Sequence, residues 1–481
     1  MANDSRVDLG RRQALKLAAG IACSAPAVAG AITKTASTNA FDVIVVGAGM
    51  AGLYAARELL RLGYRVRVLE ATERHGGRIY SKTLGNTRIE MGAEEHYLAT
   101  NNPIYNAVVN ELGQDAYVRP YVGEQLISMD GGHTCWEETG RCEEDPDIRN
   151  FWRYWSYYGN RGKHRDFSIT MAEDVYAQYG VDRDHRAYHL YDSGIAGSIY
   201  GASLERIGAA SLAQQDWIWT LSSNVRVLAP PEIGYLDILD RVWWKDVLAH
   251  VSLNSPVTHI DTSSPHVLIK DARGESYFAR KVIVTASIGV LQSESIQFNP
   301  ALPASTVDAY THIGMGRGMK VALRFSEQFW ESRMSYLITE GLSSSCWIPS
   351  SYKKDSNDLI VMCYPMGDNA QTLTDIAQAA GSGSPGDAAI IEVMLSDLDL
   401  IFRDKASANF IDGIVQDWTS HPYIRGSYSY PTLATYKSSA SSKRKQLAEP
   451  VEDRLFFAGE GTSHRNPACV PGALQEGDRA A

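Results

Sequence analysis

The sequence lacks three features that each mark a class of protein. Only 6 of its 481 residues are cysteine, and none stands in a CxxC pair or in a Cys/His spacing typical of zinc sites, so we expect no metal. After residue 40 there is no run of about eighteen uncharged apolar residues, so the mature protein is expected to have no membrane span. No basic stripe occurs either, and the formal net charge is −10. That balance argues against nucleic acid as a partner and is compatible with a cationic substrate.

The first forty residues have the pattern of an export signal. Arg11 and Arg12 precede an apolar segment of small residues that contains the cleavage-like triplet Ala27-Val28-Ala29. The pattern resembles a twin-arginine signal, although Ala14 stands where such signals favour phenylalanine. We therefore expect residues 1–40 to be a leader and the mature protein to be periplasmic or extracellular; the alternative is an ordinary N-terminal helix. The twin-arginine route carries folded proteins, so it suits a chain that binds a cofactor before export.

The cysteines leave one question open. Cys23 would be removed with the leader, which leaves an odd number in the mature chain. Cys135 and Cys142 flank a predicted hairpin, and an oxidising compartment would allow them to pair. A disulfide and two free thiols are both compatible with the sequence.

Chain length favours more than one domain. Single hydrophobic cores stop growing near about 250–300 residues, and this chain has 481. Its composition, 44% hydrophobic and 21% charged, is that of an ordinary soluble protein. Two domains are therefore expected.

A nucleotide-binding pattern follows the leader. Residues 42–46 (DVIVV) form a β-branched run typical of a buried parallel strand, and a second short strand ends at Glu70. Between them Gly47, Gly49 and Gly52 supply the G-x-G-x-x-G spacing directly before a segment of helical periodicity. Gly47 would permit the tight turn, Gly49 would let a pyrophosphate approach the backbone, and Gly52 would let the helix pack closely on the strand. The helix N-terminus would attract the anion, and Glu70 would bind ribose hydroxyls.

The residues that follow carry a family resemblance. Residues 74–78 (RHGGR) place Arg78, a planar donor for phosphate, just after the second strand, and residues 89–97 read IEMGAEEHY. With the glycine turn, these motifs resemble the flavin-containing amine oxidase family, which binds FAD and not NAD through this unit. The resemblance implies an α/β fold with a discontinuous Rossmann-like FAD-binding domain and an α+β substrate-binding domain. The expected bounds are 41–98, 230–300 and 412–481 for the first domain, and 99–229 and 301–411 for the second.

Later motifs fit the same resemblance. Residues 418–431 resemble the family's stretch W-x-x-D-P-x-x-x-G-S-Y-S, and residues 455–473 place Gly459-Glu460 at the end of a strand before a final helix. Some members attach the flavin through a cysteine just before the tyrosine, but this chain has Ser427 there, so FAD is expected to be bound without a covalent bond. The resemblance implies these cofactor-binding residues: Gly47, Gly49, Met50, Ala51, Gly52, Glu70, Ala71, Gly77, Arg78, Gly92, Ala93, Val257, Trp418, Gly459, Glu460 and Val470.

Residues 314–318 do not add a second nucleotide site. Their glycines precede a predicted strand, lack the G-x-G-x-x-G spacing and have no phosphate-facing helix start. An NAD site is therefore not expected, and the electrons of the substrate should pass directly to the flavin.

Lys320 and Tyr428 are the residues to which the resemblance assigns catalytic roles. Lys320 stands in GMKVALRF, where the family has a lysine that reaches toward the flavin N5 through a water; an ordinary strand lysine pointing at solvent is the alternative. Tyr428 would face the substrate as one wall of an aromatic cage, with Trp418 against the cofactor. Cys469 stands where monoamine oxidases have a second cage tyrosine.

A polyamine is the favoured substrate. The stretches GSYSY and RNPACVPGA most resemble the branch of polyamine oxidases and lysine-specific histone demethylases. A demethylase is not expected, because the chain leaves no room for chromatin-binding domains and carries the leader. Acidic side chains beside the cavity would receive a second ammonium of a polyamine, whereas His96 is either a substrate contact or a hydrogen-bonded loop histidine. The expected substrate-binding residues are Glu94, Glu95, His96, Tyr428 and Cys469.

The expected reaction is oxidation of an amine C–N bond by hydride transfer to the flavin N5. The imine would hydrolyse to an aldehyde and an amine, and oxygen would accept the electrons as H2O2. The alternatives are a monoamine or L-amino-acid oxidase, a flavin amine dehydrogenase with a periplasmic electron acceptor, and a flavoprotein without turnover. An amino-acid oxidase needs an arginine for the substrate carboxylate, and Arg425 and Arg465 are the nearest candidates. The protein is expected to be a monomer or a homodimer.

Three further segments have a biased composition. Residues 151–159 are rich in aromatic side chains, which is typical of a core or a tunnel wall. Residues 379–389 read as a surface linker, and residues 438–446 read as a solvated loop.

Overall fold

The β-branched run at the start of the nucleotide-binding pattern forms β1 (Phe41–Val46), a central strand of the first sheet. It lies parallel to β2 (Val66–Leu69) on one side and to β13 (Ser276–Val284) on the other. Such strands read as continuous apolar runs because both faces of the sheet are covered. The sheet order is β10 (Val251–Ser252), β2, β1, β13, β12 (Val267–Asp271), β11 (Val257–Asp261) and β14 (Gln297–Asn299).

The computed structural model describes residues 40–97, 102–120, 123–137, 142–159, 166–221, 224–353, 356–434 and 439–481. Residues 40–481 form one compact unit. The predicted leader lies outside the described residues, so its role stays a prediction. The residue bounds expected for the two domains also stay a prediction.

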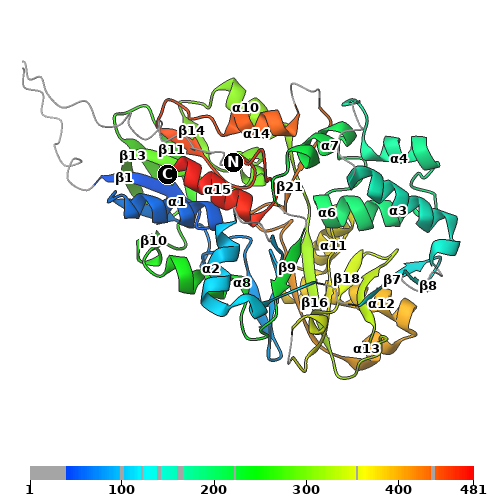
Figure 1. Cartoon of the computed structure of the whole chain (residues 1–481). Coiled ribbons are helices and arrows are strands. Elements are labelled where there is room, and N and C mark those ends of the chain that lie inside the picture. Colours follow the sequence, from blue (N-terminus) through cyan, green and yellow to red (C-terminus); the bar gives the residue numbers. More distant parts are fainter. Residues whose placement is uncertain are drawn as a thin grey trace, which may run out of the picture. The chain divides into compact units, whose positions relative to one another are not determined.

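The end of the chain returns to the first sheet. Strand β22 (Leu455–Phe457) pairs in parallel with β13, and the last helix, α15 (Val470–Ala480), packs against α1 (Met50–Arg61) beside that sheet, as Figure 1 shows. The two helices approach so closely that a Cβ on Gly477 would lie 2.4 Å from the carbonyl oxygen of Ala51. The residues around Glu460 are thereby brought to the glycine turn.

A second sheet carries Lys320 on β16 (Met319–Phe325), and the side chains of this strand alternate between two covered faces. Val321 and Leu323 pack toward the helices α11 (Gly367–Ala380) and α12 (Ser384–Phe402), whereas Ala322 packs in a different cluster with Trp347 and residues 89–91. Lys320 shares the face of Ala322, so it points inward. The sheet order is β20 (Phe410–Asp417), β16, β19 (Leu359–Cys363), β18 (Ser345–Trp347), β17 (Met334–Ile338), β7 (Glu124–Met129) and β8 (His133–Trp136).

Short sheets and further helices complete the described part of the chain. The short sheets are β3 (Ser81–Leu84) with β4 (Thr87–Glu90), β5 (His96–Tyr97) and β6 (Tyr117–Val118) with β9 (Val225–Leu228), and β15 (Ile313–Met315) with β21 (Ser429–Pro431). The helices are α2 (Pro103–Leu112), α3 (Pro146–Gly159), α4 (Met171–Tyr179), α5 (Tyr188–Tyr191), α6 (Ser198–Tyr200), α7 (Ala209–Ile218), α8 (Tyr235–Leu239), α9 (Ile288–Gln292), α10 (Ala304–Thr311), α13 (Lys405–Asn409) and α14 (Ala440–Leu447). Within the described ranges, none of the helices is long and apolar enough to cross a membrane.

The structure corrects two predicted loops and answers the cysteine question. The predicted solvated loop 438–446 contains most of α14, whose Arg444 is fully buried, because the helix packs against α10. The predicted linker 379–389 contains the first residues of α12, which begins with Pro385 in its first turn. Cys135 and Cys142 form a disulfide.

Candidate active site

The glycine turn is shaped by steric limits that a side chain would violate. Gly47 has φ +101°, and a Cβ there would lie 2.6 Å from Oγ1 of Thr285. A Cβ on Gly52 would lie 2.0 Å from the carbonyl oxygen of Gly47, so close packing of α1 on the turn requires glycine. Gly49 is the N-cap residue of α1, and it has no side chain that could accept a hydrogen bond from the helix amides. The first amides of α1 are therefore available to an anion.

Glu70, at the end of β2, is held by protein donors beside this turn. Its Oε2 accepts from the backbone amide of Ala48 at 2.7 Å, and its Oε1 accepts from the amide and the hydroxyl of Thr72 at 2.9 and 2.8 Å. These bonds fix the carboxylate at the edge of a cavity of about 1350 Å³. The cavity is larger than the roughly 300–1,000 Å³ of a typical ligand site, so it leaves room for both a dinucleotide and a substrate.

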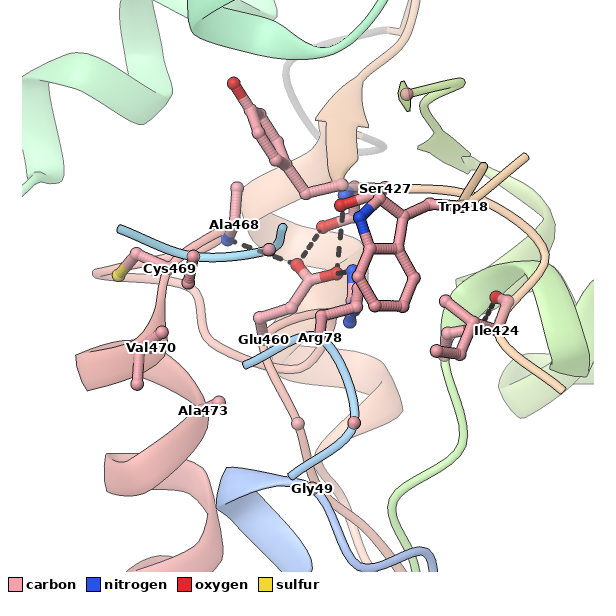
Figure 2. Close-up of a pocket in the computed structure, with 18 of the residues that line it drawn as sticks. Gly49, Arg78, Trp418, Ile424, Ser427, Glu460, Ala468, Cys469, Val470 and Ala473 are labelled. Carbon is pink, nitrogen blue, oxygen red and sulfur yellow. Dashed lines mark hydrogen bonds and ion pairs between the residues drawn. The ribbon is translucent and has the colours of Figure 1, made fainter. Parts of the chain in front are cut away.

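A buried network surrounds Glu460, whose carboxylate faces Arg78 in Figure 2. Nη1 of Arg78 donates to Oε1 of Glu460 at 3.0 Å, and the amide of Ala468 and the hydroxyl of Ser429 donate to Oε2, the amide at 3.1 Å. Burial raises the pKa of Glu460, but Arg78 and Arg444 outweigh burial and leave this pKa below its usual value. Glu460 is therefore an ionised acceptor.

Arg444 is a member of this network that sequence reasoning missed. Its Nη1 donates to the hydroxyl of Ser429 at 2.7 Å and to the carbonyl oxygens of Glu460 and Gly461 at 3.2 and 3.1 Å. Burial lowers the pKa of Arg444 to about 10, and Glu460 opposes that change. The residue lies in a serine- and lysine-rich stretch, and nothing in that stretch signals burial.

The predicted cofactor residues meet around one cavity, with a single exception. Gly52 does not line it, and its place is the contact between helix and strand. Trp418 is held by a bond from its indole nitrogen to the carbonyl oxygen of Met91 at 2.9 Å. The lining members are Gly47, Gly49, Met50, Ala51, Glu70, Ala71, Gly77, Arg78, Gly92, Ala93, Val257, Trp418, Gly459, Glu460 and Val470.

This arrangement fits a flavin dinucleotide. The helix amides and Arg78 suit a pyrophosphate, since both present N–H donors. Glu70 and Glu460 are carboxylate acceptors for hydroxyl groups on the cavity wall. The glycine turn leaves no Cβ in the way of a closely approaching ligand.

Lys320 points into the cavity wall, not at solvent. It is 4% exposed, and its Nζ donates to the carbonyl oxygen of Glu90 at 2.9 Å and to Oε2 of Glu94 at 2.8 Å. The ammonium also lies 4.8 Å from the ring centroid of Trp347. Glu94 accepts a second hydrogen bond, from the hydroxyl of Tyr352.

Tyr428 belongs to a larger group of tyrosines around the cavity. Its hydroxyl donates to the carbonyl oxygen of Ser198 at 3.0 Å, and burial raises its pKa well above the usual value. Tyr336 and Tyr364 line the same space, and burial together with the charge of Glu95 raises the pKa of both hydroxyls. These phenols are therefore neutral, and Glu95 is the carboxylate that lies among them.

Two predicted substrate residues have unexpected surroundings. His96 does not line the cavity: Nδ1 of His96 lies 2.8 Å from the hydroxyl of Tyr117, and its ring centroid lies 3.9 Å from that of Tyr235. Burial lowers the pKa of His96 to about 3, so it is a neutral core histidine. Cys469 does line the cavity, as the N-cap of α15, where its Sγ accepts from the amide of Gly472 at 3.4 Å. Burial raises the pKa of Cys469 to about 12, so its thiol stays protonated.

A helical wall of the cavity contributes aromatic groups, together with polar groups that sequence reasoning did not assign. Trp152 and Trp155 of α3 line the cavity, in agreement with the predicted tunnel wall. Asp216 of α7 accepts from the hydroxyl of Tyr200 at 3.2 Å, and the ring of Trp219 stands edge-on to Tyr97. The polar members on this side are Tyr200, Gln215 and Asp216.

The arginines considered for an amino-acid substrate are both exposed. Arg425 borders the cavity, and its Nε donates to the carbonyl oxygen of Pro422 at 3.1 Å. Arg465 is not among the lining residues. Neither guanidinium is placed among the tyrosines.

Comparisons with known proteins identify the family and the fold. The family described as flavin containing amine oxidoreductase matches residues 50–481. Human lysine-specific histone demethylase 2 is 27% identical over 480 residues, covering 92% of this chain and 53% of that protein. Probable polyamine oxidase 4 of Arabidopsis thaliana is 26% identical over 470 residues, covering 91% of this chain and 85% of that protein. A double mutant of putrescine oxidase has the same fold, with a TM-score of 0.72 at 17% identity, covering 92% of this chain and 98% of that structure. The chain spans about half the length of three of the demethylases it matches.

Proposed function

The chain belongs to the flavin-containing amine oxidoreductase family, and from that premise we propose that it oxidises a polyamine with non-covalently bound FAD. The choice of a polyamine as substrate rests on one observation: carboxylates and aromatic side chains line the same cavity. Glu95 lies among tyrosines of the cavity, and Asp216, which accepts from the hydroxyl of Tyr200, also lines it. Carboxylates and aromatic faces both attract ammonium groups. A substrate with several ammonium groups is complementary to such a surface.

The residues around the cavity would divide the work of the reaction. FAD, when bound, supplies the acceptor for a hydride from the carbon beside the amine nitrogen. The amides of α1, Arg78, Glu70 and Glu460 would hold it. Tyr428 and Tyr364 would orient the reacting amine and exclude water from it.

Distal ammonium groups of the substrate would meet the carboxylates. Glu95 would hold one of them close to the tyrosines, and Asp216 would hold a further one on the helical wall. Contacts remote from the reacting carbon fix its position, and this positioning accelerates the chemical step.

We further propose that the protein is exported and that oxygen accepts the electrons. The twin-arginine pattern and the disulfide between Cys135 and Cys142 support export. A monoamine has a single ammonium group, so it would not match both Glu95 and Asp216. An L-amino-acid oxidase would need an arginine for the substrate carboxylate, and the two arginines considered are both exposed.

Anaerobic mixing of the yellow protein with single substrates tests the proposal. Spermidine or spermine should bleach the flavin absorbance, whereas tyramine and L-amino acids should not, and air should then restore the colour with release of H2O2. Absence of bleaching by any amine would refute amine oxidation. Recovery of colour only after addition of an artificial electron acceptor would favour a dehydrogenase.

Charge-removing variants test the carboxylates. Glu95→Gln and Asp216→Asn should each raise KM for spermidine roughly 10- to 100-fold, because a hydrogen bond to a charged group is worth about 1.5–3 kcal/mol. Asp404→Asn, at an exposed aspartate away from the cavity, is the matched control and should leave KM unchanged. Equal KM values for all three variants would remove the carboxylates from substrate binding.

A further inference from the structure

Both carboxylate oxygens of Glu94 are used by the protein itself. Oε2 accepts from Nζ of Lys320 at 2.8 Å, and Oε1 accepts from the hydroxyl of Tyr352. The side chains of Lys320 and Glu94 are 5% and 9% exposed. This is a buried ion pair with a third partner, at the position where the sequence suggests a contact to the substrate.

The ion pair also fixes the direction of the lysine. An ammonium has three N–H donors, and two of those of Lys320 go to Glu94 and to the carbonyl oxygen of Glu90. Trp347 and Tyr364 flank the ammonium, with ring centroids 4.8 and 5.7 Å away. Because Lys320 lines the cavity, its remaining donor is left for a ligand or a water there.

Other charged groups lie close to the pair. The carboxylate of Glu90 accepts from the hydroxyl of Ser81 and the amide of Tyr235, both at 2.7 Å. The ammonium of Lys353 donates to the carbonyl oxygens of Pro230 and Ile233, both at 3.2 Å. Neither group is hydrogen-bonded to Lys320 through its side chain, so Glu94 is the direct counterion of this lysine among the described residues.

We infer that Glu94 is a positioning residue for Lys320 and not a contact of the substrate. It holds the ammonium in one orientation and offsets its positive charge beside the place of the flavin. This inference rests on the proposed function, because it assumes that FAD occupies the cavity. Its consequence is electrostatic: a reduced flavin gains negative charge, so the balance of charge at Lys320 sets how easily the flavin is reduced.

The midpoint potential of the bound flavin tests this role without any substrate. Glu94→Gln leaves the lysine charge without its counterion, so the potential should become more positive. Lys320→Met removes the cation and should make it more negative. The double variant should give a value close to the wild type, because the two charges that cancel are both removed. Potentials are best measured well above pH 7, because burial raises the pKa of Glu90 to about 7 while Lys353 opposes that rise.

Glu95→Gln provides the contrast at the neighbouring position. Combined with Lys320→Met, Glu94→Gln should return the potential to the wild-type value, whereas Glu95→Gln should leave it more negative than the wild type, because Glu94 is the ion-pair partner of Lys320. Glu94→Gln should also leave KM for spermidine within about twofold of the wild type, unlike Glu95→Gln.

Several results would overturn the inference. A double variant whose potential stays at the Lys320→Met value, or no shift for Glu94→Gln, would show that the two groups do not act as a pair. A KM raised by Glu94→Gln as much as by Glu95→Gln would make Glu94 a substrate contact. If Glu94→Gln does not fold, the double variant still tests the inference. A potential far from the wild-type value would show that the charges of Glu94 and Lys320 do not offset each other. An enzyme that oxidises no amine but shows the predicted potentials would refute the proposed function and leave the pair intact.

Discussion

Removal of Lys320 should destabilise the folded protein far more than removal of a surface cation. In Lys320→Met the ammonium is lost, which leaves the carboxylate of Glu94 without its counterion in a place where its side chain is 9% exposed. Breaking a buried pair by removing one partner costs about 3–5 kcal/mol of the free energy of unfolding. Tyr352 still donates to Glu94, which places the expected cost near the lower limit, at about 3 kcal/mol.

The double variant Lys320→Met/Glu94→Gln gives the coupling energy between the two sites, which is a stricter test than the single variant. Neither charge then remains buried, so the loss should fall to about 1 kcal/mol or less, and the coupling energy between the two sites should be at least about 2 kcal/mol. The control pair is Arg61 and Glu58, whose side chains are 65% and 20% exposed. Arg61→Met should cost under about 1 kcal/mol with little coupling to Glu58→Gln.

Urea denaturation of the four proteins of each cycle measures these differences, with tryptophan fluorescence and circular dichroism recorded in parallel. Coincident transitions by both probes are needed, because a long chain with a cofactor often unfolds in several steps. The reasoning is refuted if Lys320→Met is no more destabilising than Arg61→Met. It is also refuted if the Lys320 and Glu94 effects simply add.

Three further outcomes follow from single residues. Burial lowers the pKa of His96 from about 6.5 in the unfolded chain to about 3 in the folded protein. Its contribution to stability is therefore complete above pH 6.5 and is lost as the pH falls toward 3. His96→Gln should reduce the pH dependence of the free energy of unfolding, measured by urea denaturation, by up to about 1.4 kcal/mol per pH unit. Arg444→Met leaves Glu460 with one cation fewer, so unfolding should become easier by about 3–5 kcal/mol, and fluorescence titration should show weaker FAD binding. Gly52→Ala should yield folded but colourless protein by circular dichroism and flavin absorbance, because its Cβ would lie 2.0 Å from the oxygen of Gly47; a yellow variant would contradict this.

The parts of the site that sequence predicts are those encoded by neighbouring residues. The glycine turn and Glu70 follow from a strand, a helix and a second strand in direct succession, so spacing alone places them around one ligand. Lys320 is marked by the resemblance, and its inward direction follows from alternation along a strand covered on both faces.

The parts that sequence does not predict depend on contacts between distant segments. Tyr352 reaches Glu94 across 258 positions of the chain, and Tyr364 enters the cavity because β19 pairs with β16 and β18 in the second sheet. Arg444 is the clearest case. Its stretch is polar and serine-rich, which favours a loop, yet tertiary packing of α14 buries the guanidinium against Ser429 and the chain at Glu460. No local pattern distinguishes it from a solvated residue.

Glu94 and Glu95 show how the same limit affects function. In the sequence they are two adjacent acidic residues, and such a pair predicts a single role, which is attraction of a substrate cation. In the structure Glu94 is compensated by Lys320, whereas Glu95 acts on the tyrosines that line the cavity. The two neighbouring carboxylates therefore have different surroundings, and Glu94 is the one paired with Lys320. Glu95 and Asp216 both line the cavity, and two carboxylates suit a substrate with more than one ammonium group, which is why a polyamine is favoured over a monoamine.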